Sequence, residues 1–226
     1  MQAMPGFFPL YWDDKAGKLW LEIPRLDEDF LYVASLPAGL GSNDIGLDRG
    51  QLSNERVVRF VRSGPRVLLL QRNLAFRAEQ GSAAERRAVE DSFAQSVLAG
   101  FDVAAEADGR VLVDATDFFL RDAHDVIGSL RRSRQGTYML DAKRSAFYLP
   151  RTKAFPRNTE VEVMLTFGGN DPGEYVRDVA PDPRSLTVRE RHSFIRLPDP
   201  GYEPRKFDPR SGYFGTSFAD YSTPIG

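Results

Sequence analysis

Hydrophobic and polar residues alternate along much of the first third of the chain, with the two-residue period typical of β-strands that place one face on a core. The run Lys-Leu-Trp-Leu-Glu-Ile at 18–23 is the clearest example, because its leucines and isoleucine occupy every second position. The connections between such runs are short, which favours antiparallel neighbours. The predicted strands are residues 7–12, 18–23, 30–36, 56–62 and 66–72, of which the last two form a hairpin through Ser-Gly-Pro at 63–65.

The hydrophobic period lengthens to that of a helix after Ser82. Ser82 and Glu85 have the spacing of a capping box, in which the serine oxygen accepts a hydrogen bond from a helical amide and the glutamate reaches back. Gly100 can end a helix in a left-handed conformation. The apolar positions at helical spacing are Ala88, Val89, Phe93 and Val97. The pattern therefore predicts a helix over residues 83–99.

The rest of the domain is again rich in strand patterns. A second hairpin is predicted from residues 101–106 and 110–114. Residues 116–132 should form one or two short helices, with breaks near Asp122 and Gly128. Further strands are predicted at residues 137–140, 146–149, 159–167 and 185–197, and strict alternation at 159–167 favours one face toward water. We expect a β-rich α+β domain with a mainly antiparallel sheet and two or three helices.

Residues 198–226 differ from everything before them, because five prolines stand among six aromatic residues. Proline removes a backbone donor and fixes φ, so this segment cannot be a helix or a central strand. Disordered segments, in turn, are poor in aromatic residues. We expect an extended strap that packs on the surface of its own domain, residues 1–197, or of a domain that follows. The residues expected to make an interdomain contact are Tyr202, Phe207, Tyr213, Phe214, Phe218 and Tyr221.

Charge and composition exclude several classes of function. The 30 basic and 32 acidic residues give a net charge of −2 with no long block of either sign, so we expect no nucleic-acid surface. The chain has no cysteine, which excludes disulfides, thiolate metal sites and a cysteine nucleophile. Its apolar runs fall far short of the ~20 residues of a membrane span. The first residues do not form a signal peptide, so the protein is cytoplasmic or its export signal lies outside this segment.

The histidine inventory argues against an active site in this chain. His124 and His192 lie far apart in sequence, whereas an HExxH zinc site needs two histidines four residues apart on one helix. His124 with Asp122 and Asp125 could bind a metal, but clustered acids near a helix start more often cap the helix. A Ser-His-Asp triad has no Gly-x-Ser-x-Gly elbow here, and Ser193 next to His192 in a strand points to the opposite face. We therefore predict no catalytic residue and no metal ligand in this chain.

A glycine-rich loop at 39–50 resembles a dinucleotide-binding loop only superficially, because its third glycine is misplaced and no helix follows. Glycine more plausibly supplies positive φ there, with Asn43 and Asp44 forming side-chain turns. The predicted structural positions are Gly39, Gly41, Asn43, Asp44, Gly46, Asp48 and Arg49. The strand aromatics Tyr11, Trp12 and Trp20 could stack on a sugar or hold a peptide, although such residues usually belong to a core.

Three stretches of the chain together resemble a known family. They are Gly-Phe-Phe-Pro-Leu-Tyr-Trp-Asp-Asp at 6–14 with Gly-Lys-Leu-Trp-Leu-Glu-Ile at 17–23, Gly-Leu-Gly-Ser-Asn-Asp-Ile-Gly-Leu-Asp-Arg-Gly-Gln at 39–51, and Arg-His-Ser-Phe at 191–194 running through 197–199, 202–205 and 207–214 to Ser-Phe-Ala-Asp-Tyr at 217–221. The chain resembles an uncharacterised domain that stands between the signal peptide and the catalytic domain of bacterial zinc-dependent metalloproteases.

The resemblance implies a periplasmic or secreted peptidase, of which this chain is the accessory part. The extended HExxHxxGxxH zinc motif of the family's catalytic domain is absent here, so zinc is expected in the following domain and not in this chain. We expect the strap to contact that domain and to assist its folding, latency or substrate access. A cell-envelope module that binds peptide or glycan is the alternative, and a stand-alone hydrolase would need a pocket around His192 or His124.

Overall fold

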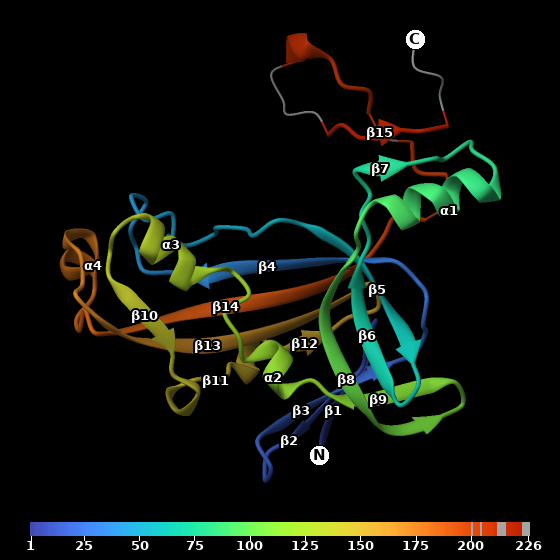
Figure 1. Ribbon diagram of the computed structural model, residues 1–226. Coiled ribbons are helices and arrows are strands. Elements are labelled where there is room, and N and C mark those ends of the chain that lie inside the picture. The colour runs from blue at the N-terminus through green and yellow to red at the C-terminus, as the bar shows by residue number, and fades with distance from the viewer. Residues whose placement is uncertain (200, 204, 212–215, 223–226) are drawn as a thin grey trace.

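A computed structural model describes residues 1–199, 201–203, 205–211 and 216–222 of the chain (Figure 1). Within these residues the chain forms one 13-stranded sheet, a separate two-stranded sheet and four short α-helices. Every pairing in the large sheet is antiparallel. The expected β-rich α+β class is confirmed, with four helices in place of the two or three predicted.

The large sheet follows the order β1-β2-β3-β9-β8-β6-β5-β4-β14-β13-β10, with β11 and β12 also paired to β13. In chain order, the first eight strands of this sheet are β1 (Gln2–Met4), β2 (Leu10–Asp13), β3 (Lys18–Ile23), β4 (Phe30–Ala38), β5 (Arg56–Ser63), β6 (Arg66–Gln71), β8 (Ser96–Ala107) and β9 (Arg110–Asp114). The later strands are β10 (Thr137–Leu140), β11 (Ala146–Phe147), β12 (Lys153–Ala154), β13 (Asn158–Asn170) and β14 (Ser185–Arg196).

The sheet curls until its two ends nearly meet. Phe7 N donates to Phe155 O at 2.7 Å, which joins the β1–β2 connection to the turn between β12 and β13. The rings of Trp12 and Phe147 lie 5.4 Å apart, in strands β2 and β11 at opposite ends of the sheet. The enclosed core is aromatic, and its largest fully buried side chains include Tyr32, Phe30, Phe60, Phe119, Phe167 and Phe194.

Four short α-helices accompany the two sheets within the described residues. They are α1 (Ala83–Ser92), α2 (Thr116–Phe119), α3 (Val126–Arg132) and α4 (Glu174–Val179), and short 3-10 turns lie at Ala142–Arg144, Leu149–Arg151 and Pro209–Ser211. Figure 1 shows α2 and α3 beside the long strands β4, β13 and β14, whereas α1 stands away from them with β7 (Phe76–Arg77) and β15 (Ala219–Asp220). Strands β7 and β15 form the separate, parallel two-stranded sheet.

The predicted helix over 83–99 is wrong beyond Ser92. The capping box at its start is present, since Glu85 N donates to Ser82 Oγ at 3.2 Å and Ser82 N donates to Glu85 Oε2 at 2.6 Å. The next seven residues do not continue the helix, because β8 begins at Ser96 and pairs with β6, placing Gly100 opposite Leu68. Strand pairing overrides local helical period here, as tertiary context often does.

Three smaller expectations are also corrected. The strand predicted at 7–12 begins only at Leu10, as β2, and β1 lies before it at Gln2–Met4. Gly128 lies inside α3 instead of breaking it. The face of β13 expected to meet water is largely covered, because Glu162 is 0% and Thr166 5% exposed. Residues 141–154 lie over this face, where Glu162 N donates to Thr152 Oγ1 and Thr166 Oγ1 donates to Arg144 O.

Candidate functional site

The strap leaves the domain where β14 ends at Arg196 and returns to it at β15. Its start is held by Asp199, whose carboxylate pairs with Arg157 and Arg196. Its end pairs with β7, because Ala219 N donates to Ala75 O at 2.8 Å and Tyr221 N donates to Arg77 O at 2.7 Å. The strap is therefore a loop that its own domain holds at both ends.

The last described part of the strap, residues 218–222, is called the tail. It returns to the domain at the tail-binding site, which consists of Ala75, Phe76, Arg77, Gln80 and Phe93. The Arg77 guanidinium lies over the Phe218 ring at 4.0 Å, a cation–π arrangement. The Phe93 ring stacks on Phe76 at 3.7 Å and also contacts Tyr221 at 5.5 Å. Gln80 N donates to Ser222 Oγ at 3.3 Å. Main-chain pairing and two aromatic contacts together define how the tail is bound.

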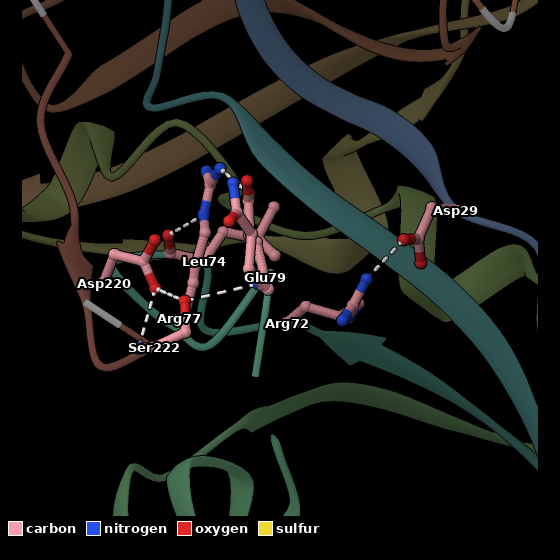
Figure 2. A network of polar contacts seen from close by, with 8 residues as sticks. Asp29, Arg72, Leu74, Arg77, Glu79, Asp220 and Ser222 are labelled. Atoms are coloured by element: carbon pink, nitrogen blue, oxygen red, sulfur yellow. Dashed lines mark hydrogen bonds and ion pairs between the residues drawn. The ribbon is translucent and has the colours of Figure 1, made fainter. Parts of the chain in front are cut away.

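Polar contacts orient the Arg77 side chain in this site. Figure 2 shows the Arg77 side chain between Leu74 and Glu79, with Asp220 and Ser222 of the tail beside it. Arg77 Nε donates to Leu74 O at 2.7 Å, and its Nη1 pairs with Glu79 at 2.8 Å. Because two partners hold the guanidinium, its flat face is free to receive the Phe218 ring. A hollow of about 260 Å³ lies beside β7 and is lined in part by Leu74, Phe76, Val89 and Phe93.

The strap aromatics predicted from the sequence are brought only partly together. Phe218 and Tyr221 contact the tail-binding site yet remain 45% and 53% exposed. Tyr202 is 67% and Phe207 57% exposed. The other two predicted positions, Tyr213 and Phe214, lie outside the described residues. Sequence reasoning missed the receiving residues Arg77 and Phe93. The three apolar residues before Arg77 show no two-residue period, and Phe93 fits a helical spacing.

The glycine-rich loop packs along β4 and has a structural role. Its predicted positions Gly39, Gly41, Asn43, Asp44, Gly46, Asp48 and Arg49 lie around Ile45 and Leu47, which are 6% and 0% exposed. Leu40 N donates to Leu47 O at 2.7 Å, and a Cβ at Gly39 would lie 2.1 Å from that same oxygen. Gly41 and Gly46 have positive φ. The turn closes through the main chain, with Gly46 N donating to Asn43 O, while the Asn43 and Asp44 side chains are exposed.

The histidine of β14 points into the core. His192 is 1% exposed, and its Nε2 donates to Phe119 O at 2.9 Å. The Tyr32 hydroxyl then donates to His192 Nδ1 at 2.9 Å and accepts from Arg121 Nη2 at 3.1 Å. Every donor in this series of three hydrogen bonds has an acceptor. His192 must accept at Nδ1 and donate at Nε2, which requires the neutral imidazole. Burial lowers the pKa of His192 to about 3, and the nearby Arg121 guanidinium acts in the same direction.

Glu190 shares this buried face, two residues before His192 on the same strand. Its Oε1 accepts from Ala123 N at 2.9 Å, and its Oε2 has no hydrogen-bond partner. Burial raises the pKa of the Glu190 carboxyl to about 8, with Asp122 adding to the effect. Sequence reasoning singled out His192 and missed Glu190, although the two-residue strand period places both on one face.

This buried cluster fastens α2 and the segment after it to the sheet. No substrate reaches side chains that are so fully enclosed, and the Ser193 hydroxyl lies on the other face, donating to Glu160 Oε2 at 2.5 Å. His124 is half-buried near Asp122, whose carboxylate accepts from Val126 N and Ile127 N at the start of α3. In the described part of the chain, no group of three or more His, Asp or Glu side chains is placed to hold a metal ion.

The aromatics of the N-terminal strands pack sideways along the sheet. Tyr11 OH donates to Glu22 Oε2 at 2.6 Å, and Trp12 packs against Phe147. Lys18 lies 5.5 Å from the centre of the Trp20 ring. All three aromatic side chains are half-buried.

Comparison with known proteins places the chain in a family without a known activity. Among the described residues, no helix is long and apolar enough to cross a membrane. No curated protein and no solved structure matches the chain. Residues 50–226, most of its length, match the family described as Domain of unknown function (DUF5117). The chain, with its strap and its tail-binding site, therefore belongs to the DUF5117 family.

Proposed function

We propose that this domain is a non-catalytic accessory domain of a bacterial zinc-dependent metalloprotease and contacts the catalytic domain of the same polypeptide through its strap. The observation that carries the proposal is the exposure of the strap aromatics Tyr202, Phe207, Phe218 and Tyr221, which ranges from 45% to 67%. Four exposed aromatic side chains within one segment of about twenty residues support a site of protein contact. Tyrosine and phenylalanine are also enriched at the centres of such contacts.

The anchoring of the strap supports the same role. Asp199 holds its start through Arg157 and Arg196, and the pairing of β15 with β7 holds its end. A loop restrained at both ends loses less conformational entropy when a partner binds than a free tail does. Tyr202 and Phe207 lie between the two anchors, so they form the proposed centre of the contact.

In this proposal, the following domain binds zinc and cleaves peptide bonds. This domain would assist folding, latency or substrate access, and the protein would be periplasmic or secreted. The enclosed positions of His192 and Glu190 agree with a structural use of these residues. The alternative is a cell-envelope module that binds peptide or glycan. One observation favours peptide binding, the pairing of β15 with β7 at the tail-binding site.

Cleavage of an unfolded substrate protein, with zinc supplied, tests the proposal. The 226-residue chain should not cleave, whereas the polypeptide extended through the following domain should cleave and should stop when zinc is chelated. In the extended protein, Tyr202→Ser with Phe207→Ser should change the rate or the yield of folded enzyme severalfold. Tyr175→Ser is the matched control, since Tyr175 is an exposed aromatic residue on α4.

Two results would overturn the proposal. Cleavage by the 226-residue chain alone would mean that it contains an active site. Equal activity and equal yield of the extended protein with and without the two strap substitutions would show that the strap makes no important interdomain contact.

A further inference from the structure

Strand β7 uses the edge of its main chain to bind the tail of the same polypeptide. Ala75 O and Arg77 O accept from Ala219 N and Tyr221 N, which is the every-second-residue pattern of strand addition to a sheet edge. Strands β7 and β15 belong to no other sheet in the described part of the chain. The bound segment is therefore held as a single added strand, as a peptide ligand would be.

Side chains add selectivity to this main-chain pairing. Phe218 lies on the Arg77 guanidinium at 4.0 Å, and Tyr221 lies 5.5 Å from Phe93. Phe93 is itself positioned by its 3.7 Å stack on Phe76. The site therefore receives two aromatic side chains three residues apart in an extended segment. A helix could not satisfy both the aromatic spacing and the two strand bonds.

The tail is bound through a small and open contact. Phe218 and Tyr221 keep about half of their surface exposed, at 45% and 53%. The adjoining helix α1 has no buried residue. The hollow of about 260 Å³ beside β7 shares Phe76, Arg77 and Phe93 with the tail-binding site. A contact with so little buried surface can open without disturbing the core.

We propose that the tail-binding site is an exchangeable docking site for extended peptides that carry two aromatic residues three positions apart, and that residues 218–222 are its resident occupant. A segment of the same chemistry from another polypeptide would displace the tail and pair with β7. This inference is independent of the proposed accessory role, because it concerns the chain by itself.

Binding of a labelled peptide with the sequence of residues 216–222, Thr-Ser-Phe-Ala-Asp-Tyr-Ser, tests the proposal on the whole chain. The resident tail competes as an intramolecular ligand at an effective concentration on the order of millimolar. The Phe218→Ala, Tyr221→Ala double variant, which weakens this competitor, should therefore bind the peptide roughly tenfold more tightly than the unaltered chain does. Adding Phe93→Ala to the double variant should remove binding, while adding Phe155→Ala, at an exposed phenylalanine outside the tail-binding site, should not.

Two altered peptides separate the contributions of main chain and side chain. Methylation of the two peptide nitrogens equivalent to Ala219 N and Tyr221 N should abolish binding, because these nitrogens donate to β7. Replacement of both aromatic residues by alanine should also abolish it. Failure of the double variant to bind the unaltered peptide, or equal binding of all three peptides, would overturn the proposal. A urea midpoint equal to that of the unaltered chain would show that the double variant is folded.

Discussion

The Glu190 carboxylate and the His192 imidazole lie 4.0 Å apart in the interior, and neither side chain is exposed. They are neighbours on the inner face of β14, and the Tyr32 hydroxyl from β4 bonds His192 there. The Arg121 to His124 segment covers them, with Arg121 bonding Tyr32 and Ala123 N bonding Glu190. Both groups are driven by burial toward their uncharged forms, since the pKa of Glu190 is raised to about 8 and that of His192 is lowered to about 3. Their protonation therefore couples stability to pH in opposite directions.

We expect the stability of the domain to be highest between about pH 4.5 and 6.5 as far as these two groups determine it. Unfolded Glu190 loses its proton above its ordinary pKa of 4.5 whereas the folded group keeps it until about 8, so stability falls as pH rises through that interval. Unfolded His192 gains a proton below 6.5 that the folded group refuses until about 3, so stability falls as pH decreases there. Urea unfolding from pH 3 to pH 9 measures both slopes.

The Glu190→Gln variant isolates one of these slopes. The amide keeps an oxygen for Ala123 N but has no proton to lose, so its stability advantage over the unaltered chain should grow from pH 4.5 to pH 8. Because one pKa unit corresponds to about 1.4 kcal/mol and the pKa of Glu190 rises from 4.5 to about 8, the gain should reach on the order of 5 kcal/mol. A constant difference between the two proteins across this range would show that Glu190 does not titrate as its burial requires.

Replacing His192 by leucine should cost roughly 2–5 kcal/mol, because Tyr32 OH and Phe119 O would each lose a buried partner. The measurement is the free energy of unfolding in urea at pH 7. His124→Leu is the matched control, since His124 is only half-buried and its Nδ1 has no partner, and its cost should stay below about 1 kcal/mol. Equal costs at the two positions would contradict the proposed chain of hydrogen bonds.

The sequence predicts the strands well wherever one face is buried. The two-residue period locates β3, β9 and β10 with the same bounds as the structure, and it places His192 and Ser193 on opposite faces. It fails at Val97 and Gly100, whose local spacing fits a helix but whose neighbour in space is β6. The decisive partner of Val97 is Leu70 of β6, 27 residues earlier in the chain, so no local pattern predicts this pairing.

Loss of the helix cap should affect α1 alone. Ser82→Ala removes the acceptor for Glu85 N and should destabilise the helix by about 1 kcal/mol. Because α1 has no buried residue, its opening is local, and amide hydrogen exchange should accelerate in α1 while β13 is unchanged. Ser92→Ala, near the other end of α1, should alter exchange much less. Equal acceleration in β13 would mean that α1 unfolds together with the core.

Two glycines should respond very differently to alanine. At Gly39 the new Cβ would lie 2.1 Å from Leu47 O, so the glycine loop must shift and we expect a loss of about 3 kcal/mol. At Gly17, φ is +66° and no atom lies within 4 Å, so strain alone should cost about 1 kcal/mol. Thermal unfolding of both variants measures the difference. A cost at Gly39 no larger than that at Gly17 would rule out the close approach of the loop to its own main chain.

Only half of the candidate site can be predicted from the sequence. The strap aromatics are predicted because aromatic residues among prolines are not typical of a solvated linker. Arg77 and Phe93, which receive the tail, look like an ordinary surface arginine and a helix residue until the fold brings residues 76 and 221 together. Glu190 was hidden for a related reason, because its raised pKa depends on the Arg121 to His124 segment that covers it.

The near closure of the sheet has a kinetic consequence. Phe8 N and Phe8 O both bond the Thr159 hydroxyl, 151 positions away, and β4 pairs with β14 across a similar separation. Contacts between such distant residues must close very long loops before they contribute stability, and chains with this contact order fold slowly. During synthesis, the edge of β4 remains unpaired until β14 has emerged from the ribosome. The N-terminal strands therefore spend the longest time exposed to aggregation, and a chaperone would be most useful to them.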